Sequence, residues 1–425
     1  MGVAKATAGD LVILGGGEPT FRPPKSIGSL ATPDPERFFH YSRIFFDSRR
    51  YTNNGPANRL LEQRLAEWHG VSRCVTFSSA FWGISLALRH LALPGRSEVV
   101  TPSLTYRRMG EIIASAGLVP RYCDVDPSTL AQSYEATKAC VNDETGLILG
   151  AHPTVNCCDA EGLELLAAET GTPLLFDSVE SAFETSKGRR VGTFGRAEAF
   201  SIHATKLING FEGGYVVTDD EELADRLRFM RGFGIVEEEE VSCFGINAKL
   251  NEVHAAMALA SLDGLPGLVE RNRSRYLAYR DALQELEGIE LRLFDEGEQT
   301  SFKNIVVRLT DSWPLSRDYT LAVLQAEGAL ARPYYSPALH TLETGFETRC
   351  GDLPVTEIVS RQHMLLPCGE QMGADDITRL AALLGLIHRH GEEIGDALDK
   401  RQGVTVNTGY QPVNAESASR SAATA

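Results

Sequence analysis

The feature that most constrains the fold is an alternation of apolar and amphipathic segments between residues 57 and 177. Short segments with the composition of strands are 74–77, 98–101, 119–125, 146–151 and 173–177. Helical patterns lie between or before them, at 57–69, up to about Leu93, at 109–117 and at 161–171. Strands that alternate with helices form parallel sheets covered on both faces. The sequence therefore predicts an α/β fold with a mostly parallel sheet and helices on both faces.

The pattern changes near residue 266, where one long charged helix is expected over 266–288, followed by extended segments and further helices. At 425 residues the chain is also longer than a single core of ~250–300 residues supports. We expect a large domain with an N-terminal arm at 1–265 and a smaller α+β domain at 266–395. Residues 396–425 are expected to be a disordered tail, because the end of the chain is rich in Ser, Ala and Asn without hydrophobic periodicity.

Composition excludes several classes of partner. The chain has 41 Lys and Arg against 57 Asp and Glu, a net charge of −16, and such an acidic surface repels nucleic acid. No apolar run approaches the ~18–20 residues that span a bilayer, so no membrane association is expected. The N-terminus lacks the pattern of a signal peptide, and the eight cysteines show no CxxC spacing. We expect a cytoplasmic protein without a metal site.

The chemistry is concentrated between residues 173 and 218. An apolar strand ends in Asp177, and Lys206 follows 29 residues later, ahead of Gly213-Gly214. A shielded carboxylate can hold a protonated ring nitrogen, and a lysine can bond to an aldehyde. Pyridoxal 5'-phosphate (PLP) needs both groups from its protein. On spacing alone, a solvated lysine and an aspartate that caps a helix remain the alternative.

Several motifs occur in the order of a known family. The segment FSIHATKLINGFEGGYVVTDD resembles the cofactor-lysine segment of the DegT/DnrJ/StrS family, the PLP-dependent sugar aminotransferases of fold type I. The resemblance extends over residues 12–395 and includes YTNNGP at 51–56, GINAKLNE at 245–252 and RPYYSPALH at 332–340. It implies the fold type I PLP-transferase fold.

The resemblance also implies roles for individual residues. Lys206 matches the lysine that binds PLP covalently, and Asp177 matches the aspartate on its ring nitrogen. Ser201, together with the segment that ends in Ala80 and Phe81, matches the groups that bind the phosphate. A helix N-terminus at Ala80 would suit an anion.

Two further matches concern the ring and the assembly. Tyr106 matches the aromatic residue stacked on the cofactor ring. Asn247 matches an asparagine that reaches the phosphate of the neighbouring subunit's cofactor. The resemblance thus implies a homodimer with shared active sites and an inactive monomer.

Three departures from the family pattern affect the substrate more than the cofactor. Glu180 stands where the family usually has His or Gln near the cofactor's phenolic oxygen. It is either an ionised carboxylate, a protonated hydrogen-bond donor, or the partner of a nearby arginine. Ala80 and Phe81 replace Gly-Thr, and Arg107-Arg108 follow the stacking aromatic residue, where they would clamp a phosphate or carboxylate if they face the pocket.

Histidines near the site leave their roles open. His203 lies three residues before Lys206, and along an extended run it would face the opposite side. His152 and His340 either line the pocket or are satisfied structural residues.

The predicted function is transfer of an amino group from glutamate or glutamine to a keto sugar, nucleotide-linked, in amino-deoxysugar or antibiotic biosynthesis. Residues 51–54 and 332–335 are candidates for substrate contact. One alternative keeps the cofactor and replaces the acceptor with a keto-cyclitol or another ketone without a nucleotide. A second alternative is a PLP-binding regulatory protein without turnover. Because Lys206 is present, the family's dehydratases, which carry His there, are excluded.

Overall fold

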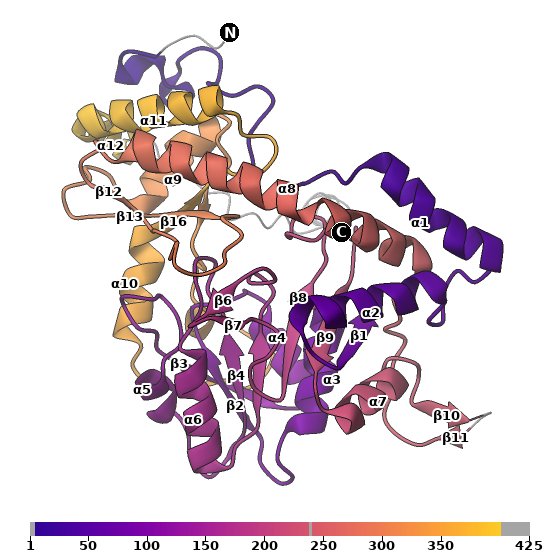
Figure 1. The fold of residues 1–425 in the computed structure, drawn as a ribbon. Helices are drawn as coiled ribbons and strands as arrows, with labels where there is room; N and C mark the ends of the chain where they lie inside the picture. The colour runs from indigo at the N-terminus through magenta and orange to yellow at the C-terminus, as the bar shows by residue number, and fades with distance from the viewer. Residues whose placement is uncertain (1–4, 238–239, 401–425) are drawn as a thin grey trace, which may run out of the picture.

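The computed structural model describes residues 5–237 and 240–400, and a large sheet of eight strands lies at its centre (Figure 1). In spatial order the strands are β1 (Arg73–Phe77), β9 (Gly214–Thr218), β8 (Ala197–Ser201), β5 (Leu174–Asp177), β4 (Thr145–Ala151), β2 (Glu98–Pro102), β3 (Val119–Cys123) and β15 (Arg349–Cys350). Among them, β9 alone is antiparallel to its neighbours. The other strands point the same way, so their carboxyl ends meet at one edge.

Helices cover both faces of this sheet, which confirms the predicted architecture. One face packs on α2 (Pro56–His69), α6 (Ala160–Thr170) and the first half of α8 (Glu252–Leu283). The other packs on α3 (Ala80–Leu91), α4 (Met109–Ser115) and α7 (Glu221–Met230). Shorter elements around the sheet are α5 (Tyr134–Lys138) and the hairpins β6–β7 (Thr185–Ser186, Arg189–Arg190) and β10–β11 (Ile235–Glu237, Glu240–Val241).

Local sequence signals fix several of these helices. Helix α2 begins with Pro56 in its first turn and ends at Gly70, which adopts a left-handed conformation with φ 75°. In α6 the side chain of Asp159 accepts a hydrogen bond from the N–H of Gly162, and Gly171 ends the helix in the same way as Gly70. Helix α1 (Pro35–Ser48), which lies against α8, begins after a similar cap at Asp34.

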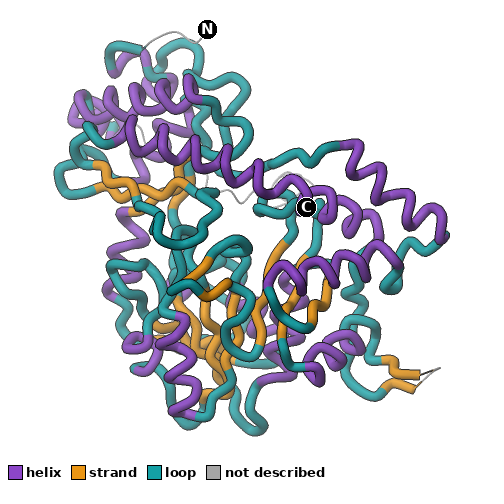
Figure 2. Tube along the Cα trace, in the orientation of Figure 1, coloured by secondary structure: helices purple, strands orange, loops and turns teal. Residues whose placement is uncertain are grey.

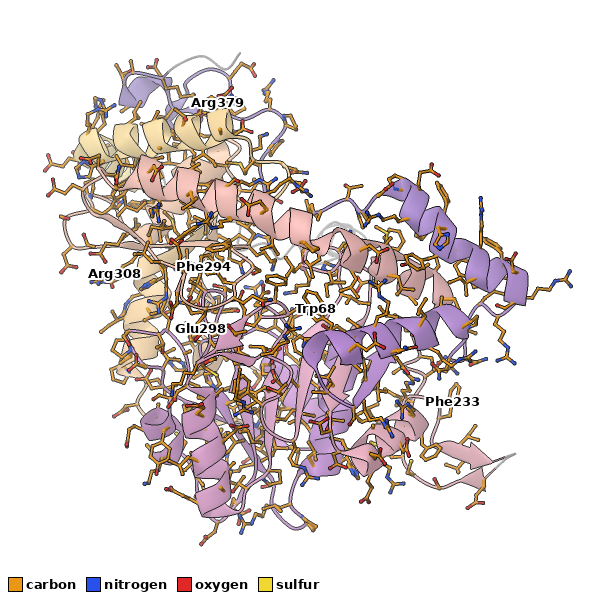
Figure 3. All side chains as sticks on the ribbon, viewed as in Figure 1. Trp68, Phe233, Phe294, Glu298, Arg308 and Arg379 are labelled. Atoms are coloured by element: carbon orange, nitrogen blue, oxygen red, sulfur yellow. The ribbon has the colours of Figure 1, made fainter. Side chains whose placement is uncertain are left out.

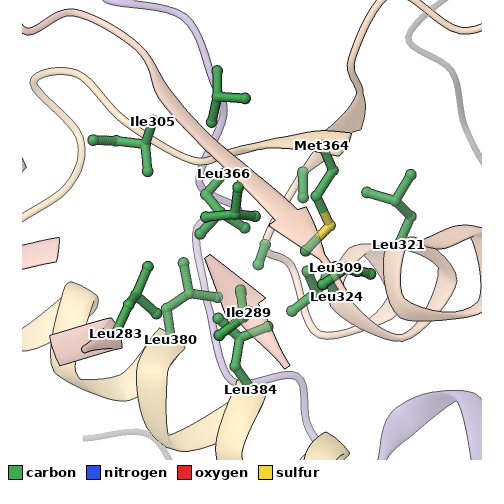
Figure 4. Close-up of a cluster of buried hydrophobic side chains, with 14 of the residues drawn as sticks. Leu283, Ile289, Ile305, Leu309, Leu321, Leu324, Met364, Leu366, Leu380 and Leu384 are labelled. Atoms are coloured by element: carbon green, nitrogen blue, oxygen red, sulfur yellow. The ribbon is translucent and has the colours of Figure 1, made fainter. Parts of the chain in front are cut away.

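A second, smaller unit holds a four-stranded antiparallel sheet. Its strands are β12 (Ile289–Leu291), β13 (Ile305–Leu309), β16 (His363–Leu366) and β14 (Arg332–Pro333). The helices beside it are α9 (Arg317–Ala326), α10 (Pro354–Gln362), α11 (Ala374–Arg389) and α12 (Gly391–Asp399), and η3 (Leu339–Thr341) lies between β14 and β15. Leucine, isoleucine and methionine side chains from these strands and helices fill its core (Figure 4).

Helix α8 joins the two units as one continuous element of 32 residues (Figure 1). The sequence predicted a helix over 266–288, whereas the observed helix begins 14 residues earlier and contains Pro266 in its interior. The apolar pattern of its first half is the signature of burial against the large sheet, which periodicity alone does not distinguish from a strand. The division at residue 265 stays a prediction, and α8 runs across it.

Two segments lie in a different unit from the one that the sequence assigned to them. Residues 8–21, expected as an arm of the large domain, pack into the core of the small unit, and the carboxylate of Glu327 accepts hydrogen bonds from the N–H groups of Val12 and Thr20. Conversely, β15 extends the large sheet by pairing with β3. Helix α12 continues to Asp399, so residues 396–399 of the expected tail are helical, and 401–425 lie outside the described residues.

The loop that precedes β13 lies against the β6–β7 hairpin of the large unit. Phe294 and Glu298, both labelled in Figure 3, mark this junction. Glu298 accepts hydrogen bonds from the Thr185 hydroxyl and the Gly188 N–H. Figure 2 distinguishes the loops of both units from their helices and strands by colour. The junction therefore brings residues 298–304 of the small unit beside the carboxyl edge of the large sheet.

Within residues 5–237 and 240–400, no helix combines the length and apolar character that crossing a membrane requires.

Candidate active site

A cavity of about 330 Å³ lies where the large-sheet strands end. It is lined by residues that follow β4, β5 and β8, by the first turn of α3, and by Tyr335 of the small unit. Six of the predicted cofactor residues line this cavity together with Lys206: Ala80, Phe81, Tyr106, Asp177, Glu180 and Ser201. Asn247 is the predicted site residue that does not.

Asp177 is the last residue of β5, a central strand flanked by β4 and β8. Its side chain is buried, and Oδ1 accepts a hydrogen bond of 3.2 Å from the N–H of Val179. Burial raises the pKa of Asp177 to about 6, against the opposing effect of that hydrogen bond and of Lys206. A cationic group that entered the cavity beside this carboxylate would favour its ionised form.

Lys206 follows β8 in a tight turn, in which its N–H donates to the carbonyl of His203 at 2.9 Å. The sequence left the role of His203 open, since only an extended run would aim it away from Lys206. Because the chain turns, both side chains line the cavity. His203 Nδ1 lies 2.8 Å from the Thr205 hydroxyl, and Nε2 lies 3.5 Å from Glu212.

Glu180 forms the centre of a three-residue ion cluster. One carboxylate oxygen accepts a hydrogen bond from Lys206 Nζ and the other from Lys303 Nζ. Asn304 Nδ2 lies 3.4 Å from the second oxygen. Although burial acts to raise it, the two ammonium groups hold the pKa of Glu180 well below its usual range. Glu180 is therefore the ionised carboxylate among the alternatives considered, with lysines rather than an arginine as partners.

The N-terminus of α3 faces the cavity through Ala80 and Phe81. Ser79 precedes the helix in extended conformation, and no side-chain hydrogen bond caps the first turn. Gly214 lets β9 pass close beneath, since a Cβ there would lie 2.3 Å from Ala80 N. Backbone N–H groups at such a helix start attract anions. Ser201, at the end of β8, contributes a hydroxyl to the same cavity.

A second cavity of about 500 Å³ adjoins the first and shares Tyr106, Glu180, Lys206 and Tyr335 with it, together with Thr205. Its wall is rich in cationic side chains: Arg107, Arg108, Lys206, Lys303 and Arg332. Arg108 pairs with Glu111 at 2.7 Å.

Arg107 and Arg332 have no hydrogen-bond or ion-pair partner for their side chains within the part of the chain that the structure describes. Burial and the neighbouring Arg107 lower the pKa of Arg332. Arg107 and Arg108 both line the second cavity. The guanidinium groups of Arg107 and Arg332 make the electrostatic potential at this wall more positive.

Three residues considered from sequence lie elsewhere or act structurally. Asn247 is exposed, forms a backbone bridge with Gly232, and lies outside both cavities of its own chain. His340 bonds to Ser103 at 2.7 Å and lines neither cavity. His152 stacks on Phe176, accepts a hydrogen bond from the Cys158 N–H, and also contributes to the cavity wall.

Sequence reasoning missed Lys303 and Asn304, which reach the site from the small unit. The available signal was a charged residue inside the otherwise apolar segment FKNIVVRL, where Lys303 is 5% exposed. A buried lysine requires a charged partner, so its position ahead of a core strand indicates a functional contact.

The cavity fits PLP in three independent respects. It has a buried carboxylate for a ring nitrogen, a lysine amine for an aldehyde, and an uncapped helix start for a phosphate. On a mostly parallel sheet with a smaller second unit, these groups define a PLP-dependent transferase of fold type I.

Comparisons with known proteins agree with this class. The model of the DegT/DnrJ/EryC1/StrS aminotransferase family matches residues 35–384. The dTDP-4-amino-4,6-dideoxy-D-glucose transaminase of Shigella dysenteriae is 26% identical, over 81% of this chain and 93% of its own. The L-glutamine:2-deoxy-scyllo-inosose aminotransferase of Streptomyces fradiae is 29% identical, over 82% of this chain and 91% of its own.

Solved structures show the same relationship. DesI in the presence of its TDP-sugar product is 34% identical, with a TM-score of 0.86, 92% of this chain and 99% of that chain being covered. DesV of S. venezuelae in complex with a ketimine intermediate is 26% identical, with a TM-score of 0.74, over 82% of this chain and 94% of that chain. The chain belongs to the DegT/DnrJ/EryC1/StrS aminotransferase family. It is a PLP-dependent aminotransferase, and the alternative of a regulatory protein without turnover is set aside.

Proposed function

We propose that this enzyme transfers an amino group from glutamate or glutamine to a nucleotide-linked keto sugar, in the formation of an amino-deoxysugar or related antibiotic component. The observation that carries the proposal is the pair of adjoining cavities that share Lys206. One has the groups that hold PLP, and the other has cationic walls. The sugar-nucleotide names of the Shigella relative and of the DesI structure support the same substrate class.

In this proposal, the first cavity holds the cofactor through groups from several elements. Asp177 binds the ring nitrogen, Lys206 binds the aldehyde carbon, and the N–H groups at Ala80 and Phe81 bind the phosphate together with Ser201. Tyr106, 49% exposed at the boundary of the two cavities, covers the ring. When bound, PLP supplies an electron-accepting ring that stabilises negative charge at the substrate carbon.

Lys206 then moves the proton. Its Nζ would accept a proton from the α-carbon of the amino donor and pass it to the cofactor, and in the second half of the cycle it would carry a proton from the cofactor to the acceptor carbon. The amine needs to be unprotonated for the first transfer, so its contact with ionised Glu180 has to be released before it acts.

The second cavity is suited to the anionic parts of the substrates. Arg107 and Arg332 offer guanidinium donors that have no partner among residues 5–237 and 240–400, and a carboxylate or phosphate oxygen pairs well with such a planar group. The donor amino acid carries carboxylates, and a nucleotide-linked acceptor carries a diphosphate. Both substrates can therefore use this wall in turn.

We also propose a homodimer in which Asn247 reaches the partner's cofactor phosphate. Its exposure outside its own cavities is compatible with that role. Large apolar side chains on and after α1 are exposed in the single chain and would be covered by a second copy: Phe39, Phe46 and Tyr51. Sedimentation analysis of the loaded enzyme tests this, since a stable, fully active monomer would contradict it. A cytoplasmic location stays a prediction.

The function is tested by separating the two half-reactions. Addition of glutamate or glutamine to the PLP-loaded enzyme should remove its visible absorbance and release the corresponding 2-oxo acid. The resulting enzyme is then mixed with a panel of 4-keto and 3-keto nucleotide sugars and matched sugars without the nucleotide. We expect the absorbance to return with the nucleotide-linked ketones. Return with the nucleotide-free compounds alone would overturn the nucleotide-linked assignment.

A keto-cyclitol acceptor is the second candidate. The inosose aminotransferase relative, at 29% identity, favours it. An inosose in the same panel distinguishes the two, because a cyclitol has no diphosphate and gains nothing from the cationic wall. Measured in the second half-reaction alone, with enzyme that the amino donor has already converted, the rate with the inosose should be insensitive to the loss of Arg332, whereas the rate with a nucleotide sugar should fall.

A further inference from the structure

We propose that Glu180 and Lys303 together form a dock for the Lys206 amine, in which Lys303 is a positioning residue that keeps Glu180 compensated whenever Lys206 leaves it. The inference rests on the proposed role of Lys206 as the cofactor-binding lysine and adds a residue from the small unit to the machinery of the large one.

Glu180 contacts two cationic side chains, one through each carboxylate oxygen. Its two carboxylate oxygens each accept a hydrogen bond from a different ammonium group, Lys206 on one side and Lys303 on the other. The three side chains are 16%, 19% and 6% exposed for Glu180, Lys206 and Lys303, respectively. Lys303 therefore has little access to water and depends on Glu180 for its stabilisation.

The support for this pair comes from both units. Glu180 lies in the loop after β5, whereas Lys303 lies two residues before β13. Asn304 Nδ2 donates a hydrogen bond of 3.1 Å to the carbonyl of Thr154 and lies 3.4 Å from a carboxylate oxygen of Glu180. These contacts hold the segment around Lys303 against the large unit. The dock is thus complete only when the small unit is seated on the sheet edge.

Charge balance explains why a second lysine is useful. While Lys206 is free, Glu180 has two cationic partners. Once Lys206 moves toward the cofactor, one partner leaves, and a buried carboxylate without compensation would oppose the move. Lys303 remains, so Glu180 keeps an ion pair in both situations. Loss of Lys303 should therefore penalise the PLP-loaded protein more than the PLP-free protein.

Substitution of Lys303 should weaken PLP binding, whereas substitution of Glu180 should not. In Lys303→Met, Lys206 is the last cationic partner of Glu180, and PLP binding takes it away. We therefore expect PLP to bind about 10- to 100-fold more weakly. In Glu180→Gln, two ammonium groups face each other in the PLP-free protein, and PLP binding relieves that repulsion, so affinity should be unchanged or higher. The double variant should return to within about 3-fold of the wild-type affinity.

The experiment is a titration of PLP into PLP-free protein, followed by absorbance and by the unfolding midpoint with and without PLP. Lys303→Gln is the second variant, since it keeps a hydrogen-bond donor without the charge. Lys187→Met is the matched control, because Lys187 pairs with Glu161 on the surface, where the lysine is 66% exposed. It should bind PLP as the wild type does.

The outcomes separate this inference from the proposed function. Equal loss of PLP affinity in Lys303→Met and in the double variant would overturn the dock, because a merely structural role is not rescued by Glu180→Gln. Wild-type affinity in both Lys303 variants would overturn it as well. Retention of the PLP–protein visible absorbance in Lys206→Ala would instead contradict the role of Lys206, whatever the Lys303 variants do.

Discussion

Asp177 and Glu180 are three residues apart and line one cavity, but their surroundings act on them in opposite directions. Asp177 is held by the large unit alone, at the end of a central strand, and burial raises its pKa to about 6. Glu180 lies where the small unit arrives, and two ammonium groups outweigh burial and keep its pKa well below the usual range. Asp177 would thus gain a cationic partner when a cationic ring binds, whereas Glu180 is already paired with two ammonium groups.

We call the surroundings of Asp177 the Asp177 edge of the cavity and those of Glu180 the Glu180 edge. The difference between them shows which parts of the site are formed before the cofactor binds. The Asp177 edge lacks a strong partner and gains one when a cationic ring arrives. The Glu180 edge is already ion-paired and has to give up a partner for the lysine to act. Removal of groups from each edge should therefore produce different signatures, from the largest effect to the smallest.

Lys206 influences both carboxylates, so its removal is the strongest perturbation of the comparison. We expect Lys206→Ala to lower the transamination rate by roughly 10³-fold or more, because both cofactor attachment and proton transfer are lost. The variant should lack the visible absorbance of the PLP–protein complex. Measurement of 2-oxo acid release and of the spectrum checks both effects, and near-normal turnover would contradict the assignment.

Asp177→Asn tests the edge that belongs to the large unit. Asn keeps the shape and can accept the hydrogen bond from the Val179 N–H, but it cannot hold a proton on the ring nitrogen by charge. We expect turnover to fall by roughly 10²-fold or more with PLP still attached to Lys206. Single-turnover absorbance changes with glutamate measure this directly. An unchanged rate would remove Asp177 from the chemistry.

Much of the Asp177 edge could be predicted from sequence, because it depends on local order. A strand that ends in a carboxylate, a lysine after the next strand and glycines before another are all readable along the chain, and the sheet brings strand ends together. The turn at 203–206 was the exception. A four-residue turn without Gly, Pro or Asn carries little turn signal, so the sequence alone left the position of His203 open.

The Glu180 edge could not be predicted in the same way. Its partner Lys303 lies 123 residues further along the chain and arrives only because residues 298–304 pack against the β6–β7 hairpin. No periodicity reports such a contact. The packing of residues 8–21 on the small unit is a similar case, since the buried carboxylate of Glu327 that binds them is more than 300 residues away.

The stability of the PLP-free protein should separate the two carboxylates by sign. The folded-state pKa of Asp177, about 6, is above its ordinary value of 3.8, so its ionisation opposes folding as pH rises through this window. Asp177→Asn should therefore stabilise the PLP-free protein by up to about 3 kcal/mol above pH 6, with little effect near pH 4.

Glu180 has the opposite sign, since its folded-state pKa is depressed. Its contribution is present above the ordinary carboxylate range and is lost as pH falls through the lowered value. Glu180→Gln should thus destabilise the PLP-free protein at neutral pH, and the loss should shrink below about pH 4. Unfolding midpoints of both variants across pH 4 to 8 check the pair. Shifts of the same sign at pH 7 would contradict the comparison.

Arg332 gives the smallest expected effect and extends the comparison to the wall of the second cavity. Its guanidinium lacks an internal partner among the described residues and shares the wall with Arg107. Since it contacts neither the lysine cluster nor Asp177 through any described hydrogen bond, Arg332→Ala should raise KM for an anionic substrate about 10-fold and change kcat little. Arg361→Ala is the control, because Arg361 is 68% exposed in a surface pair with Glu357. If instead kcat fell and KM stayed unchanged, Arg332 would act on the lysine cluster, and the small unit would contribute to chemistry rather than to substrate binding alone.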